Sequence, residues 1–98
     1  MLFRSGEPGL NKRAIAYLND ASREEGRDSQ VWHFLAVAYG RDNQMGMAAL
    51  SLAEQALANG KKKDAMQQAN RAKQLLPRNR APYARAEDIH REAEHLDK

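Results

Sequence analysis

The chain has 98 residues, a formal net charge of +3 and no cysteine. A chain of this length forms at most one small domain, and any catalytic cavity in it would be shallow. The missing cysteines exclude disulfide bonds and cysteine-based zinc sites. No apolar stretch approaches the roughly 18 residues that a bilayer span requires, so we expect no insertion into a membrane.

Apolar residues recur at helical spacing along the chain, and the period-two alternation of a strand never persists. We predict five helices, at residues 10–25, 30–41, 45–59, 62–75 and 82–96. Gly60 suits the left-handed residue that ends a helix, and Pro82 suits the first turn of the last one. Lys61 to Lys63 are expected near the carboxyl end of the third helix, where positive charge is favourable.

A repeat pattern connects these helices. The residue order typical of the tetratricopeptide repeat is present in this chain, at Trp32, Leu35, Ala36, Tyr39, Ala48 and Leu52. An overlapping frame uses Leu52, Ala53, Ala56, Gly60, Ala65, Ala69, Ala72 and Pro77. We therefore predict an all-α, tetratricopeptide-like helical hairpin solenoid of about five helices. It occupies residues 1–98 as a single domain of a longer protein, with a half-repeat at 10–25.

Most apolar side chains are expected to be core, as helical apolar stripes usually are. The predicted core contains Trp32, Leu35, Tyr39, Leu52, Leu57, Leu75 and Leu76. The first helix carries a stripe broad enough for neighbours on two sides, formed by Leu10, Ala14, Tyr17, Leu18 and Ala21. Since terminal repeats normally have a polar outer face, this stripe predicts self-association.

No residue pattern indicates catalysis or metal binding. His90 and His95 are five residues apart, whereas the zinc motif HExxH needs histidines four apart on one helical face. No nucleophile motif is present. We predict no catalytic residue, no metal site and no cofactor in this chain.

Charge is distributed unevenly near the carboxyl end. Residues 61–85 contain eight basic residues against the single acid Asp64, and the last helix is acidic. A basic cluster is the first requirement for binding nucleic acid. Tyr83 is the only aromatic residue nearby, so the segment has few side chains that could stack on bases. Nucleic-acid binding is therefore an alternative that we rank below a protein partner.

Residues 35–89 read LAVAYGRDNQMGMAALSLAEQALANGKKKDAMQQANRAKQLLPRNRAPYARAEDI. This stretch resembles the carboxyl-terminal tetratricopeptide region of bacterial periplasmic HExxH zinc metallopeptidases, which are linked to outer-membrane protein assembly and quality control. The resemblance implies a periplasmic parent protein with a signal sequence and an upstream catalytic domain, and zinc only in that domain. Ala81 stands where the family leads us to expect a capping serine.

We predict a non-catalytic module that binds a protein or an extended peptide segment, such as a protease substrate, an assembly partner or the upstream protease domain. A free-standing cytoplasmic adaptor is the alternative of the same class. In a tetratricopeptide solenoid the first helix of each pair lines the concave face. The candidate partner-binding residues are Gln30, His33, Val37, Arg41, Gln67, Arg71 and Gln74.

Overall fold

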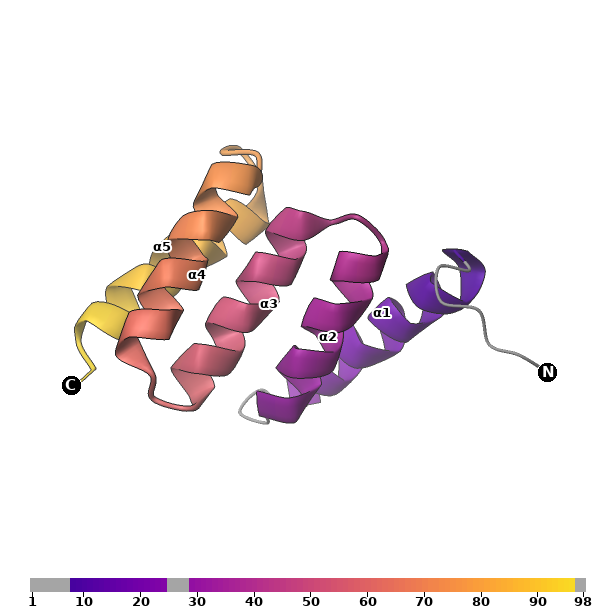
Figure 1. Ribbon diagram of the computed structural model, residues 1–98, viewed down its shortest axis with the longest axis horizontal. Helices are drawn as coiled ribbons and strands as arrows, with labels where there is room; N and C mark the ends of the chain where they lie inside the picture. The colour runs from indigo at the N-terminus through magenta and orange to yellow at the C-terminus, as the bar shows by residue number, and fades with distance from the viewer. Residues whose placement is uncertain (1–7, 25–28, 97–98) are drawn as a thin grey trace.

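The computed structural model describes residues 8–24 and 29–96, and within them the chain forms five helices and no strand (Figure 1). The helices are α1 (Pro8–Glu24), α2 (Ser29–Arg41), α3 (Met45–Ala58), α4 (Lys62–Leu75) and α5 (Ala81–Glu94). Every predicted helix is present, and each boundary lies within two residues of the predicted one. The all-α, solenoid-like class predicted from the sequence is confirmed.

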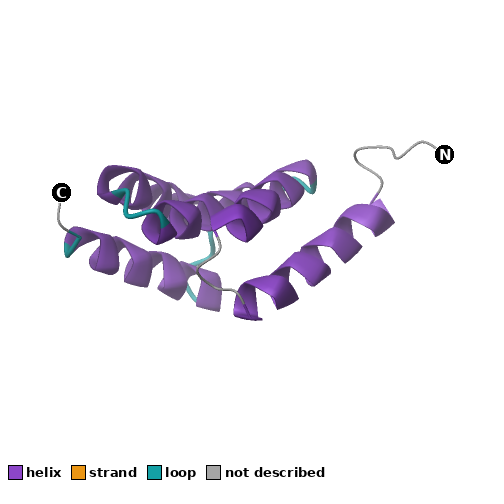
Figure 2. Ribbon diagram, turned by 90° about the horizontal axis from the view of Figure 1, so that it is seen from below, coloured by secondary structure: helices purple, strands orange, loops and turns teal. Residues whose placement is uncertain are grey.

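Each helix packs against the next one along the chain, as in a series of helical hairpins. Helices α2, α3 and α4 lie side by side, with α1 behind α2 and α5 behind α4 (Figures 1 and 2). Helix α5 also contacts α3. Between α2 and α4 no described Cα atoms approach within 8 Å. Helix α3 therefore separates the two helices on which the sequence placed the binding residues.

The main core is built from small side chains, which lets the helices approach closely. The alanines without exposed surface are Ala53, Ala65, Ala69, Ala72, Ala86 and Ala93. The close approach is clearest at Gly46 in α3, where an added Cβ would lie 2.8 Å from the Cδ2 atom of Leu76. The regular alanine spacing in the sequence therefore has a packing role.

The predicted core is only partly correct. Leu35 and Tyr39 are buried, but Leu75 is 49% exposed. The buried positions of α4 follow the series Ala65, Ala69 and Ala72, which continues one turn later at Leu76. Leu75 lies about 100° to one side of that series. Trp32, Leu52, Leu57 and Leu76 are half-buried.

Ile89 of α5 is fully buried, although it was absent from the predicted core. It occupies the centre of a short stripe formed with Ala86 and Ala93, which are spaced three and four residues from it. Helix α5 exposes none of the large hydrophobic side chains found exposed among the described residues. The outer face of α5 is therefore polar, as in a capping helix at the end of a solenoid.

Two helices end in the same left-handed motif. Gly60 has a φ of +72°, the Lys61 N–H donates to the Ala56 carbonyl at 2.9 Å, and the Gly60 N–H donates to the Leu57 carbonyl at 3.1 Å. This is the Schellman motif, and it confirms the role predicted for Gly60. Asn43, with a φ of +61°, has the same role after α2. Asparagine is the residue other than glycine that commonly accepts this conformation.

The lysine run lies near the carboxyl end of α3, as expected, but it also begins α4. Lys61 is the N-cap residue of α4, and Lys62 begins the helix, so these side chains lie at an amino end where positive charge is unfavourable. No side chain caps this end, and Asp64 in the first turn supplies an opposing negative charge. At α5, the N-cap residue is Arg80 rather than Ala81, and Pro82 lies in the first turn as predicted.

An ion pair joins α5 to α3. The Arg85 guanidinium donates to both carboxylate oxygens of Glu54, from Nε at 2.6 Å and from Nη2 at 2.8 Å. The Glu54 side chain is only 12% exposed. This two-point contact is the main cause that raises the pKa of Arg85 above its usual value, with Glu92 adding to it. Paired planar groups of this kind hold a defined geometry, so Arg85 aligns α5 with α3.

Among the described helices, α1 packs only against α2. The Asn11 side-chain amide donates to the Ala38 carbonyl at 2.9 Å, and Lys12 pairs with Asp42 at 3.4 Å. The pKa of Asp42 lies below its usual value, chiefly because the Gln44 side chain donates a hydrogen bond to it. On the other flank of α1, Tyr17 is 74% exposed and Ala14 is also exposed. The side chain of Leu10 falls outside the described part of the structure.

Candidate functional site

All seven predicted binding residues are exposed. Four lie on α2 and three on α4, so the structure does not join them into one patch, because α3 runs between those helices. The His33 ring lies 5.9 Å from the ring of its neighbour Phe34. Gln67 and Gln74 share the side of α4 that points away from the buried Ala69 and Ala72, by the 100° turn per residue.

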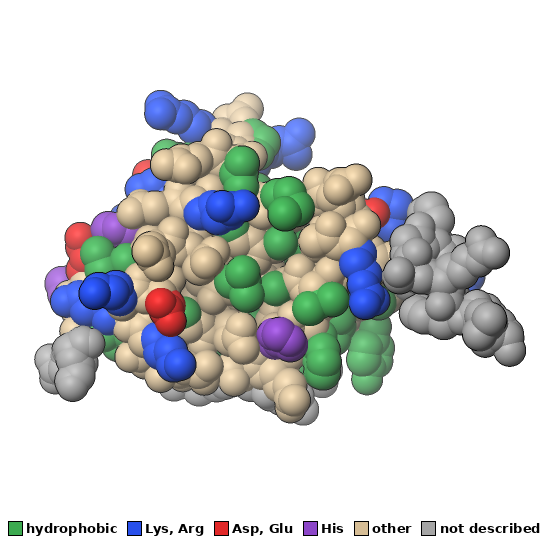
Figure 3. All heavy atoms as spheres, in the orientation of Figure 1, with side chains coloured by type: hydrophobic (Ala, Val, Ile, Leu, Met, Phe, Trp, Pro, Cys, Tyr) green, Lys and Arg blue, Asp and Glu red, His purple; other side chains and the backbone are tan. Residues whose placement is uncertain are grey.

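Five exposed residues lie toward one end of the α2–α3–α4 layer, two on α2, one on α3 and two on α4. Helix α3 begins where α2 and α4 end, because it runs in the opposite direction to both (Figure 1). This end carries the apolar–basic patch, which we define as Val37, Arg41, Met45, Arg71 and Leu75. Figure 3 shows hydrophobic and basic side chains interspersed on this face. Arginine suits carboxylates and main-chain carbonyls, and apolar neighbours add contact area.

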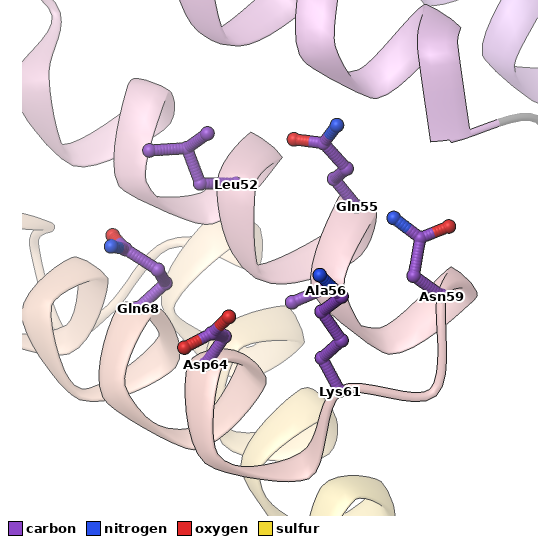
Figure 4. A pocket seen from close by; sticks show the side chains of 7 residues that line it. All are labelled: Leu52, Gln55, Ala56, Asn59, Lys61, Asp64 and Gln68. Atoms are coloured by element: carbon purple, nitrogen blue, oxygen red, sulfur yellow. The ribbon is translucent and has the colours of Figure 1, made fainter.

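A cleft opens between α3 and α4 on the same face. Its volume is about 360 Å³, and it is lined by Leu52, Gln55, Ala56, Asn59, Lys61, Asp64 and Gln68 (Figure 4). Helical spacing aligns it with the apolar–basic patch. Met45, Leu52 and Asn59 are seven residues apart on α3, and Asp64, Gln68, Arg71 and Leu75 are three or four apart on α4. The cleft and part of the patch therefore form one groove, which we call the α3–α4 groove.

Most polar groups of the cleft have no partner. Within residues 11–23 and 29–96, the side chains of Gln55, Asn59, Lys61 and Asp64 form no hydrogen bond or ion pair. The Oε1 atom of Gln68 is buried and also accepts no hydrogen bond. Buried acceptors are nearly always satisfied in folded proteins, so this atom requires an explanation.

None of the cleft residues is among the seven predicted binding residues. The repeat pattern treats α3 as a packing helix, and it selects Gln67 and Arg71 on α4 rather than Gln68. The signal that was available is the helical spacing of polar residues. Gln55 and Asn59 are four residues apart, as are Asp64 and Gln68, so each pair shares one face of its helix.

No described group of three or more His, Cys, Asp or Glu side chains has an arrangement that could hold a metal ion. The Nδ1 atom of His90 lies 3.7 Å from the Glu94 carboxylate, and His95 is exposed at the end of α5. None of the helices in the described part of the chain is both long enough and apolar enough to cross a membrane.

Comparisons with protein-family models, curated proteins and solved structures found no match to this chain.

Proposed function

We propose that this chain is a non-catalytic interaction module that binds an extended segment of another protein on the face formed by α2, α3 and α4. The observation that carries the proposal is the apolar–basic patch, in which two arginines flank exposed apolar side chains. Neither Arg41 nor Arg71 forms an ion pair with another described residue, so both guanidinium groups are available to a partner. The chemistry favours a segment that carries carboxylates and apolar side chains.

The sequence resemblance supports a finer form of the proposal. In that form the chain is the accessory repeat domain of a periplasmic zinc metallopeptidase, and it recruits substrates or assembly partners for an upstream catalytic domain. The alternative is a stand-alone cytoplasmic adaptor. The parent gene distinguishes them: an HExxH helix behind a signal peptide supports the peptidase, and a parent without either supports the adaptor.

We rank nucleic-acid binding below protein binding for a reason that the structure strengthens. Tyr83, the one aromatic side chain near the basic segment, is half-buried. Base stacking on exposed aromatic rings is a main source of affinity for single strands. A salt-dependent gel shift with single-stranded DNA or RNA would favour this alternative.

The proposed surface is tested by reversing its two charges. The probe is an unstructured decapeptide of Asp, Ser and Ala with a fluorescent label, and anisotropy measures its binding. We expect Arg41→Glu with Arg71→Glu to weaken binding about tenfold or more, because each arginine is placed to form a charge-assisted hydrogen bond with the peptide. The melting temperature should change little, since both side chains are exposed.

The matched control for that pair carries the same change of charge on another helix. Arg13→Glu with Arg23→Glu alters two exposed arginines of α1, of which Arg23 pairs only with the exposed Asp20 of the same helix, and should leave peptide binding nearly unchanged. Equal losses in the two double variants would show a response to net charge alone. That result would contradict the proposed surface.

The exposed flank of α1 supports a second proposal, that copies of the chain associate through it. Tyr17 and Ala14 are exposed on this flank, whereas Ala21 packs against the core. Arg13 and Asp20 carry opposite charges at its border, and Asp20 also pairs with Arg23 on the same helix at 2.8 Å. An antiparallel pair of α1 helices centred on Tyr17 brings the opposite charges toward each other. We expect Tyr17→Lys to abolish self-association in sedimentation velocity, and Tyr17→Phe to retain it. A wild-type mass of one chain at all concentrations would contradict the proposal.

A further inference from the structure

Exposed apolar side chains gather at the end of the molecule that α1 and α2 form. Tyr17, Phe34 and Val37 are three of the five large hydrophobic residues found exposed among the described residues. Figure 3 shows hydrophobic side chains over α2 and on its side away from α3. Phe34 belongs to none of the surfaces described above. A cluster of exposed apolar side chains on a small domain marks an interaction site.

The packing of α1 against α2 places these side chains on one side of the hairpin. Each exposed position immediately precedes a residue of the α1–α2 contact. Equivalent positions in two antiparallel helices lie on the same side of the pair. The exposed residues and the contact residues that follow them are Ala14 and Ile15, Tyr17 and Leu18, Phe34 and Leu35, and Val37 and Ala38. The four exposed members, Ala14, Tyr17, Phe34 and Val37, form what we call the α1–α2 end face.

The α1–α2 end face points away from the rest of the solenoid. Ala36 and Tyr39 follow Phe34 and Val37 by two residues each, which is a turn of about 200° around α2. Both are buried, so the packed side of α2 lies opposite the end face. Among the described helices only α1 and α3 contact α2, and neither covers the end face.

A second copy of the chain is the occupant that suits this face. The other end of the solenoid is closed by α5, whose outer face is polar. A head-to-tail contact would therefore press apolar side chains against charged ones and bury charges without partners. Two copies that meet through the same face cover apolar surface with apolar surface, and this two-fold contact closes after two chains. An antiparallel pair of α1 helices also brings Arg13 of one copy toward Asp20 of the other.

The size of the face predicts a weak dimer. Helix α1 has 17 residues and is therefore about 25 Å long, and two packed helices are about 20 Å wide. The footprint of about 500 Å² per chain is smaller than the roughly 800 Å² that each partner buries in a stable complex. We expect a dissociation constant in the micromolar range, so that monomer and dimer are both populated at ordinary concentrations.

We propose that two copies of the chain associate through the α1–α2 end face, and that this dimer withholds part of the apolar–basic patch from the peptide. Val37 belongs to both surfaces, and Arg41 lies one turn further along the same side of α2. This inference rests on the proposed function and on self-association, and it adds that the two compete. Only the monomer presents the complete patch, so protein concentration regulates binding.

Two substitutions with matched exposure separate the surfaces. Phe34 and Leu75 are both 49% exposed, but Phe34 belongs only to the end face and Leu75 only to the apolar–basic patch. We expect Phe34→Ser to sediment as a monomer at all concentrations and to bind the Asp, Ser and Ala decapeptide fully. Leu75→Ser should self-associate like wild type and bind the decapeptide more weakly. Tyr17→Lys provides a second monomeric variant, and circular dichroism checks that each variant is folded.

The competition is measured by the dependence of peptide binding on protein concentration. Sedimentation velocity first gives the monomer fraction of wild type at each total concentration. Where about one-tenth of wild type is monomeric, the labelled decapeptide should bind it about tenfold more weakly than it binds Phe34→Ser, because only the monomer is competent. Where wild type is almost wholly monomeric, the two proteins should bind the decapeptide equally.

The outcomes separate this inference from the proposed function. If wild type self-associates but binds the decapeptide with one affinity at all concentrations, the dimer leaves the patch open, and the competition is overturned while the function stands. A wild type that stays monomeric overturns it too, as does self-association of Phe34→Ser and Tyr17→Lys at the wild-type level. If monomeric Phe34→Ser is folded and binds no decapeptide, the proposed function fails and the competition fails with it.

Discussion

Replacing Ile89 with alanine is expected to lower the free energy of unfolding by about 2–5 kcal/mol. Ile89 has no exposed surface, and it lies in a core that is otherwise composed mainly of alanine. The side chains of its neighbours Ala86 and Ala93 are too short to fill the vacated volume. The cost within this range depends on how far Leu50 and the leucine and methionine side chains packed against the cluster move into the cavity. Urea unfolding followed by circular dichroism measures it.

Leu75→Ala is the control for this variant, because the sequence predicts that Leu75 also belongs to the core. In the structure Leu75 is 49% exposed at the end of α4. Its truncation should cost less than about 1 kcal/mol, since roughly half of the side chain is already in water. If Leu75→Ala destabilised the chain as much as Ile89→Ala, the packing of α4 described above would be wrong.

Gly46→Ala is expected to destabilise the protein even though alanine favours a helix. The new Cβ would lie 2.9 Å from Leu76 Cγ and 3.3 Å from the Leu75 main-chain carbon. Relieving such contacts typically costs about 1–3 kcal/mol. The gain in helix propensity recovers at most about 1 kcal/mol. The net effect is a loss of stability, as α3 is forced away from the end of α4.

Gly40→Ala adds the same methyl group where there is room for it. No atom lies within 4 Å of the Cβ position at Gly40, and this residue is in the last turn of α2. We expect a gain of about 0.5–1 kcal/mol from the reduced freedom of the unfolded chain. The two substitutions should therefore change the melting temperature in opposite directions. A gain at Gly46 would show that α3 and α4 are not in close contact there.

The helices could be located from the sequence because their signals are local. A left-handed glycine at position 60 and a proline in the first turn at position 82 act within a few residues of the chain. Asn43 was not singled out from the sequence, although its left-handed conformation is part of the same local motif and asparagine commonly accepts it. For the lysine run the sequence reading considered only the end of α3, whereas Lys61 to Lys63 also lie at the start of α4.

The binding surface could not be derived in the same way. Gln67 and Gln68 are neighbours in the sequence, but one helical step of 100° places only Gln68 in the cleft. The choice between them depends on which helices cover α4, and α4 packs against α3 and α5 without touching α2 in the described residues. Helix α3 therefore became part of the candidate surface, where the repeat pattern had assigned it to packing alone.

By itself the sequence determined that the described part of this protein is all-helical and divided into five segments, because periodicity and helix-end residues act over short distances. Only the tertiary structure decided that Ile89 rather than Leu75 is buried, and that the carboxamides of α3 and α4 share one cleft. Burial and proximity are properties of neighbouring helices, and a helix pattern states which residues share a face without stating what covers that face.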